Sequence, residues 1–184
     1  LGTIQTKVSD MAFDYSSGVM YAITDDTQIS MVDTSNGEMY PVLTQEDQVL
    51  VALTVDEKGT VYVIGRKAGS TQADASLYTA DLTAGTLTKI GDTGQKAVME
   101  QSMTYDFENG YIYWAQAWAK AGEGRELNLC IVNPKNGYAS VIGKIGESGS
   151  EVSALYCDSP DEPQAPYVEL EDIHIGQGAE TDLI

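Results

Sequence analysis

Carboxylates recur at one place in a repeated pattern of this sequence. Asp14, Asp56, Asp106 and Asp158 each follow a short apolar run, and the first three precede a polar turn that a glycine closes. Two carboxylates at a suitable separation are what a glycosidase needs. An aspartate at the mouth of a turn also caps the backbone N–H groups of that turn. We interpret all four as turn caps rather than as catalytic acids.

Other catalytic side chains are scarce. The single histidine, His174, excludes Ser-His-Asp and Cys-His constellations and histidine-based zinc or iron sites, and we expect it on a strand surface. Cys130 and Cys157 lack the C-x-x-C spacing of a redox or zinc site. The repeat described below places them on different strands. We therefore predict two free thiols, with Cys157 buried in an apolar column.

A calcium site is the one metal site that the acidic segments suggest. Oxygen-bearing side chains alternate along DTSNGE at 33–38, as in a shortened calcium loop. The segment departs from the twelve-residue EF-hand pattern, and its copies at Asp81 and Asn133 lose the remaining acids, so a hairpin turn is the better interpretation. Asp25 and Asp26 form a weaker candidate. We assign no metal and no cofactor, and calcium stays open as a weak alternative.

Both tryptophans of the chain lie within one five-residue stretch that basic residues follow. Aromatic faces beside hydrogen-bonding groups are typical of sugar and peptide recognition. We take Trp114, Trp118, Lys120 and Arg125 as candidate ligand-binding residues, together with Arg66 from an earlier variable loop. In the alternative interpretation Trp114 packs between neighbouring sheets and Trp118 fixes its own loop.

The composition limits what these residues can belong to. The chain has 184 residues, 42% of them hydrophobic, which is enough for one domain with a core. Eighteen glycines, eleven tyrosines and no helical stripe predict an all-β fold. A net charge of −18 disfavours nucleic acid and anionic membranes as partners but not cations or basic surfaces. No apolar run predicts membrane insertion, and because the chain starts at Leu1 we expect that a targeting segment or another part has been removed.

One pattern occurs three times: DYSSGVMYAI from Asp14, DEKGTVYVIG from Asp56 and DFENGYIYWA from Asp106. Each copy predicts a first strand, a turn and a second strand centred on a tyrosine, followed by a third strand, a turn and a fourth strand. The leading aspartates are spaced by 42, 50 and 52 residues. We predict that Tyr21, Tyr62 and Tyr113 occupy equivalent positions on the second strands.

A period of 40 to 50 residues with four antiparallel strands is the signature of a β-propeller blade. The pattern carried by Asp14, Gly18, Tyr21, Asp33 and Gly37 and their copies resembles the blades of bacterial extracellular propellers of the YVTN, NHL and quinoprotein-like kind. The tryptophan-aspartate and glycine-histidine signatures of WD-repeat blades are missing. The resemblance implies an all-β, propeller-like array of four-stranded blades over residues 1–158, in a secreted or cell-surface bacterial protein.

The predicted boundaries divide the chain into blades, a linker and a tail. Three complete blades are followed by a proline-rich linker and by a tail that resembles the start of a bacterial immunoglobulin-like module or adds a strand. The predicted segments are blades at about 8–43, 51–91 and 100–146, partial blades at 1–7 and 152–158, the linker at 159–166 and the tail at 167–184. Either the two partial blades join and close a ring, or the chain is an arc whose exposed edges pair with a second copy as a homodimer.

The loops between second and third strands, at 24–27, 65–75 and 116–126, should share one face of the propeller. They vary most in length, and variable loops on a rigid scaffold usually carry binding. We therefore favour a non-catalytic recognition or spacer module that binds a glycan, peptide or protein partner on this face. The alternative is a carboxylate-dependent polysaccharide lyase or glycoside hydrolase on a propeller scaffold, against which the scarcity of histidine weighs.

Overall fold

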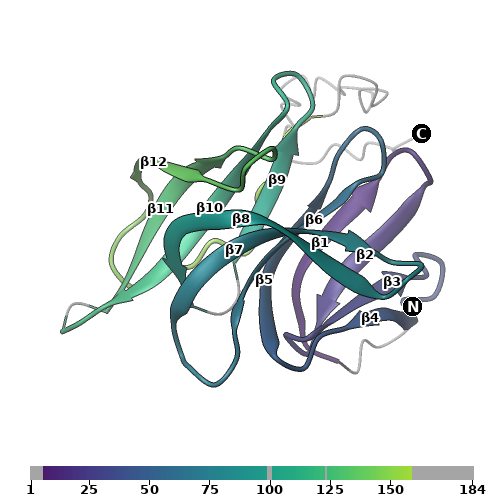
Figure 1. Ribbon diagram of the computed structural model, residues 1–184, viewed down its shortest axis with the longest axis horizontal. Coiled ribbons are helices and arrows are strands. Elements are labelled where there is room, and N and C mark those ends of the chain that lie inside the picture. Colours follow the sequence, from purple (N-terminus) through teal and green to yellow (C-terminus); the bar gives the residue numbers. More distant parts are fainter. Residues whose placement is uncertain (1–5, 99–100, 123, 159–184) are drawn as a thin grey trace, which may run out of the picture.

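A computed structural model describes residues 6–98, 101–122 and 124–158, and three antiparallel four-stranded sheets make up this described part of the chain (Figure 1). The first sheet contains β1–β4, the second β5–β8 and the third β9–β12, and strands that follow one another in the chain lie side by side. The strands are β1 Val8–Asp14, β2 Val19–Thr24, β3 Gln28–Val32, β4 Met39–Thr44, β5 Gln48–Val55, β6 Val61–Lys67, β7 Ala73–Asp81, β8 Thr86–Ala97, β9 Ser102–Asp106, β10 Tyr111–Lys120, β11 Gly124–Val132 and β12 Ala139–Lys144. The prediction of an all-β chain built from four-stranded antiparallel sheets is confirmed.

The turn after the first strand of each sheet is held by the aspartate that ends that strand. Asp14 Oδ1 accepts the N–H of Ser16 at 2.9 Å, and Asp56 Oδ1 accepts the N–H of Lys58 at 2.9 Å. Asp106 Oδ1 accepts the N–H of Glu108 at 3.0 Å. The interpretation of these three aspartates as turn caps is confirmed. Asp158 is the last residue of its described segment, so any turn after it lies outside the described residues.

The turns between third and fourth strands are capped in the same way, by the side chain of their first residue. Asp33, Asp81 and Asn133 each accept, through Oδ1, the N–H of the residue two positions later, at 2.9, 3.0 and 2.9 Å respectively. The segment 33–38 is therefore a hairpin turn, as its sequence predicted.

The strand register places the three tyrosines at equivalent positions. Tyr21 lies opposite Ala12 and Met31, Tyr62 opposite Thr54 and Thr79, and Tyr113 opposite Thr104 and Ile131. The residue facing each tyrosine on the first strand lies two positions before the leading aspartate. This confirms the alignment of the repeats.

The core lies between the sheets, where their first strands approach one another. β1 packs against β5, β5 packs against β9, and β1 also contacts β9. One continuous cluster of buried side chains runs through all three sheets, including Ile23 and Ile29 of the first, Leu53 and Val63 of the second and Trp114 of the third. A sheet with one apolar face buries it only by packing on a neighbour, so the repeat requires its adjoining copies.

Two sequence predictions differ from the structure. Residues 152–158 were expected as the first strand of a partial blade but have no strand pairing. Instead, Leu155 N donates to Ser102 Oγ at 3.0 Å and Cys157 N donates to Thr104 Oγ1 at 3.1 Å, so side chains replace the backbone acceptors of a ladder. The expected loop at 116–126 is mostly strand, because β10 extends to Lys120 and β11 starts at Gly124.

Both cysteines are free, as predicted. Cys130 is buried, whereas Cys157 is only partly buried because it lies in the unpaired segment. Other predictions fall on residues 1–5 and 159–184, outside the described residues: the closing strand before Thr6, the linker, the tail and the place of His174.

A close backbone contact joins the third sheet to the second. A Cβ atom on Gly91 of β8 would lie 2.0 Å from the carbonyl oxygen of Asn136, and one on Gly137 would lie 2.7 Å from the carbonyl oxygen of Gly91. Only residues without a side chain allow this approach. The turn between β11 and β12 is thereby fixed against β8.

We predict that Gly91→Ala destabilises the domain by about 1–3 kcal/mol, because the obstructing atoms belong to backbone that cannot rotate away. Gly143→Ala on β12 is the control, since a Cβ there meets nothing within 4 Å. Urea unfolding followed by circular dichroism measures both variants. Equal midpoints for Gly91→Ala and Gly143→Ala would contradict the close contact.

Candidate functional site

Two of the predicted ligand-binding residues lie inside the domain. Trp114 is 0% exposed and belongs to the core cluster that runs through all three sheets. Arg66, 2% exposed, lies on β6 and donates to the carbonyl oxygens of Ser70 at 2.6 Å and Val98 at 3.4 Å. Arg66 thus ties the β6–β7 hairpin to the end of β8. Neither residue offers a surface to a ligand in this structure.

The other three predicted residues lie together on the β10–β11 hairpin. Trp118 is half-buried on β10 opposite Glu126, and Lys120 Nζ lies 3.5 Å from Glu126 Oε1. Arg125 forms an ion pair with Glu151. The hairpin end is linked to the second sheet, because Ala119 N donates to Gln72 Oε1 at 2.6 Å. We name this end of the sheets, with the turns at 25–27 and 68–72 and the end of the β10–β11 hairpin, the loop end.

A larger aromatic site lies at the opposite end, which carries the turns at 14–18, 56–59 and 106–110 and which we name the turn end. A cavity of about 240 Å³ opens there between β1, β5, β9 and the segment 155–157. We name it the central pocket. Its lining consists of Met11, Ala12, Phe13, Tyr15, Met20, Thr54, Val55, Met103, Thr104, Phe107, Leu155, Tyr156 and Cys157.

Aromatic rings connect the pocket to the turns around it. Tyr15 contacts Phe13 and Phe107 edge to face, with ring centroids 5.0 and 5.8 Å apart. Phe107 contacts Tyr105 at 5.3 Å, and Tyr105 stacks on Tyr62 at 6.4 Å. Edge-to-face and offset contacts are the preferred arrangements of such rings. The lining is therefore held in place by rings from all three sheets.

Two tyrosine hydroxyls and one thiol at this end keep their protons at neutral pH. Burial, with Asp56 nearby, raises the pKa of Tyr62 to about 12, and burial together with Glu57 raises the pKa of Tyr105 further. Burial also raises the pKa of the Cys157 thiol, and only a thiolate is a good nucleophile. Of these three groups only Cys157 lines the central pocket, where burial keeps its thiol in the less nucleophilic protonated form.

A buried carboxylate lies where the first strands meet. A bulge in β1 between Val8 and Asp10 interrupts the register, and the Asp10 side chain reaches both neighbouring sheets. Asp10 Oδ2 accepts the N–H groups of Leu53 at 2.9 Å and Met103 at 3.4 Å, and Oδ1 accepts the hydroxyl of Ser102 at 3.0 Å. Burial raises the pKa of Asp10 to about 7, although these hydrogen bonds oppose the rise.

This hydrogen-bond network positions the wall of the central pocket. Met103 donates its N–H to Asp10, and Leu155 donates its N–H to Ser102 Oγ, which itself bonds Asp10. The side chains of Met103 and Leu155 both line the central pocket. Asp10 therefore acts as a positioning residue for a site that it does not line.

Sequence reasoning missed both the central pocket and Asp10, although each left a signal. Tyr15 and Phe107 directly follow two of the leading aspartates, where the second copy has Glu57. The position four residues before each leading aspartate reads Asp10, Ala52, Ser102 and Ala154, so two polar residues stand in a column of small residues. Neither signal fits the four-strand pattern itself, and both could have been read as departures from it.

Among the described residues, no group of three or more His, Cys, Asp or Glu side chains could hold a metal ion, and no helix could cross a membrane. Calcium binding therefore gains no site from the described part of the chain. Asp26, one of the acids considered for calcium, accepts Lys7 Nζ at 2.9 Å and Ser9 Oγ at 2.7 Å.

Comparison with known proteins shows the fold. No family model and no curated protein matches the chain. A solved nidogen/laminin complex matches 76% of this chain and 49% of its own with a TM-score of 0.53 and 13% identity. An oligogalacturonate lyase in complex with manganese matches 75% of this chain and 36% of its own with a TM-score of 0.50 and 12% identity. The fold is propeller-like.

The chain spans about half or less of the length of these propeller-like structures. A protein of unknown function from Bacteroides caccae is also similar, at 9% identity and a TM-score of 0.45, over 80% of this chain and 48% of its own. Identities this low show the fold alone. The nidogen/laminin complex and the lyase show that both a protein complex and an enzyme share this propeller-like fold, so the fold does not distinguish binding from catalysis.

We predict that Asp10 makes the domain less stable as the pH rises from about 4 to 7. The unfolded chain ionises this carboxyl near its ordinary pKa of 3.8, while the folded chain keeps the proton up to a pKa of about 7. Unfolding therefore releases a proton in this window, and the free energy of unfolding falls by up to about 1.4 kcal/mol per pH unit. Hydrogen bonds from Ser35 and Asn109 lower the pKa values of Asp33 and Asp106. The contribution of these two carboxyls to the pH dependence of stability therefore falls below the pH range of Asp10.

Urea unfolding of the wild type and of Asp10→Asn across this pH range checks the assignment. The variant should lose the downward slope, because it has no carboxyl to titrate. Asp74→Asn, at an exposed position on β7, should keep the wild-type slope. An unchanged slope in Asp10→Asn would refute the raised pKa.

Proposed function

We propose that the chain is a non-catalytic recognition module of a secreted or cell-surface bacterial protein, and that its central pocket takes an apolar side chain from a cationic segment of a protein partner. The observation that carries this proposal is the pocket lining, which combines methionines and aromatic rings from separate strands. The resemblance to bacterial extracellular propellers supports the location. The loops between second and third strands differ in length among the three copies, which also supports a binding role. Those loops lie at the loop end, opposite the central pocket.

The shape and lining of the central pocket suit an apolar anchor residue. A volume of about 240 Å³ is below that of a typical small-molecule site, which is about 300 Å³ or more, and suits one inserted side chain. Met11, Met20 and Met103 provide flexible, polarizable walls that adapt to the group that enters. Met11 is 51% exposed and Tyr156 is 61% exposed, so both are available at the mouth.

Charge at the turn end favours a cationic partner. The three turns carry Asp14, Asp56, Glu57, Asp106 and Glu108, whereas Lys58 is their one basic residue. Lys58 is itself paired with Glu57 at 3.7 Å. Such an acidic rim attracts a basic segment during the encounter and repels acidic competitors.

A lyase or glycoside hydrolase would require acidic side chains facing a ligand cavity. The thirteen residues that line the central pocket include no Asp or Glu. Asp10, whose pKa is raised by burial to about 7, does not line the pocket, and its oxygens accept hydrogen bonds from β5 and β9. These features support binding over catalysis.

Selection from a displayed random-peptide library against the intact 184-residue chain tests the proposal. We expect enrichment of peptides that place Leu, Met or Phe beside Lys or Arg. Tyr156→Ala and Phe107→Ala should weaken the selected peptide by about tenfold or more, as loss of an anchor contact does. Thermal melts would confirm that both variants fold.

Tyr40→Ala is the matched control, because Tyr40 is 47% exposed on β4 of the first sheet and does not line the central pocket. Trp118→Ala tests the loop end. If Trp118→Ala weakens the selected peptide while Phe107→Ala and Tyr156→Ala do not, the binding surface lies on the β10–β11 hairpin. If the library yields no enriched peptide, the proposed peptide recognition is wrong, and the chain is better interpreted as a spacer module.

A further inference from the structure

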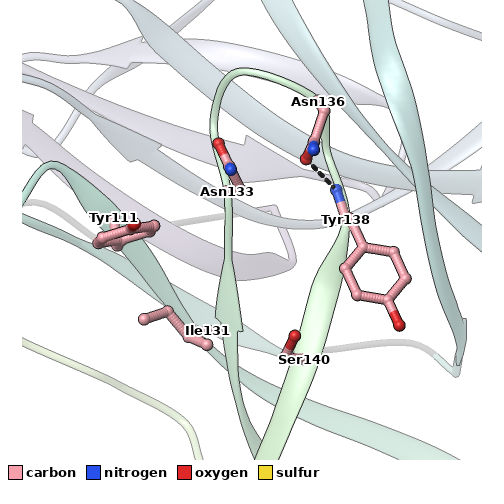
Figure 2. A pocket seen from close by; sticks show the side chains of 6 residues that line it. All are labelled: Tyr111, Ile131, Asn133, Asn136, Tyr138 and Ser140. Carbon is pink, nitrogen blue, oxygen red and sulfur yellow. Dashed lines mark hydrogen bonds between the residues drawn. The ribbon is translucent and has the colours of Figure 1, made fainter.

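A second cavity lies on the third sheet, apart from the central pocket. It has a volume of about 170 Å³, and we name it the third-sheet groove. Figure 2 shows Tyr111 and Tyr138 on opposite sides of the groove, with Asn133 and Ser140 between them. Its lining residues are Tyr111, Ile131, Asn133, Asn136, Tyr138 and Ser140.

The groove exists because the third copy of the repeat departs from the other two at a shared site. Tyr111 replaces Val19 and Thr60, two positions before the equivalent tyrosines. Tyr138 replaces Glu38 and Thr86, directly after the turn glycine. The turn itself keeps its hydrogen bonds, so the tyrosines are not needed to form it.

Glycine contacts hold the groove rigid. The close approach of Gly137 to Gly91 fixes the turn that carries Asn136 and Tyr138 against β8. A Cβ on Gly94 would lie 3.4 Å from Cε2 of the Tyr138 ring, so this backbone supports one edge of the ring. A ring held in place loses little freedom when a ligand stacks on it.

The polar groups of the groove are oriented by the turn. Asn133 Oδ1 accepts the N–H of Lys135 at 2.9 Å, and Asn136 Oδ1 accepts the N–H of Tyr138 at 3.0 Å. Because each amide oxygen is committed to the backbone, the Nδ2 groups remain as donors, beside the Ser140 hydroxyl. None of the lining residues carries a charge.

We infer that the third-sheet groove binds one neutral sugar ring of a glycan. The apolar C–H face of a sugar stacks on the exposed tyrosines, of which Tyr111 is 41% and Tyr138 is 58% exposed. Its hydroxyl groups accept from the two asparagine amides and exchange a hydrogen bond with Ser140. The lining provides no cation and the chain has a net charge of −18, so the groove offers uronic acids and sulfated sugars no counter-charge among its lining residues.

The inference does not depend on the peptide-binding role of the central pocket, which uses different residues. A glycan array that contains neutral and uronic-acid oligosaccharides, followed by calorimetry with the best neutral oligosaccharide, tests it on the intact chain. We expect neutral sugars to bind and acidic ones to be rejected. Tyr138→Ala should weaken the neutral oligosaccharide about tenfold or more.

Asn133→Asp is a second variant that keeps the fold. Asp33 and Asp81 occupy the same turn position in the other copies and accept the same backbone hydrogen bond, so the turn survives while the Nδ2 donor is lost. We expect about a fivefold to tenfold loss of affinity, as for loss of one hydrogen bond of about 1 kcal/mol or slightly more. Tyr40→Ala on the first sheet and Tyr156→Ala at the central pocket should bind the sugar as the wild type does.

Three outcomes would overturn the inference. The first is an array and calorimetry in which no neutral oligosaccharide binds at millimolar concentration. The second is wild-type affinity in Tyr138→Ala. The third is a dimer in sedimentation that Tyr138→Ala dissociates while no sugar binds, which would make this face an interface between two copies of the chain.

Discussion

The carboxylate of Asp10 is the point at which the three sheets are joined. Removing a carboxylate from water carries a penalty of several kcal/mol unless donors replace the water. Here the donors are the N–H groups of Leu53 on β5 and Met103 on β9, with the Ser102 hydroxyl beside them. Since the strands of three different sheets must be in register for these bonds to form, the carboxylate stabilises only one relative placement of the sheets.

The central pocket follows from that placement. Backbone N–H groups of Met103 and Leu155 take part in the Asp10 and Ser102 network, and their side chains form the wall of the central pocket. The side chains of Asp10 and Ser102 do not themselves line the pocket. A polar junction thus positions an apolar site, which explains how an extended segment without strand pairing at 152–157 keeps a defined place.

The sequence predicted those parts of the fold that local chemistry determines. The leading aspartates, the turn glycines and the tyrosines at 21, 62 and 113 gave the four-stranded sheets and their register. Features that need two sheets at once were not predictable, such as the contact of Gly91 with Asn136 or the burial of Arg66. Trp114 was misleading because an aromatic residue that departs from a repeat fits both a core and a surface, and only packing distinguishes them. Trp118 was placed in a loop because the length of the β10–β11 hairpin depends on pairing that sequence columns do not show.

Some residues of this chain differ from their counterparts in the other copies of the repeat. The physical requirement behind each difference indicates whether the residue serves the fold or a binding site. Of the equivalent positions Asp10, Ala52, Ser102 and Ala154, only the first carries a carboxylate. The side-chain oxygens of Asp10 and Ser102 lie 3.0 Å apart, and two carboxylates this close would repel and could not both ionise. Asymmetry at the junction is therefore required by the fold. No such requirement acts on Tyr111 and Tyr138, because the other sheets make the same turn with Val19 and Glu38 or with Thr60 and Thr86. Tyr111 and Tyr138 are exposed, and neither the turn nor the core requires them. We therefore assign these two departures from the repeat to binding.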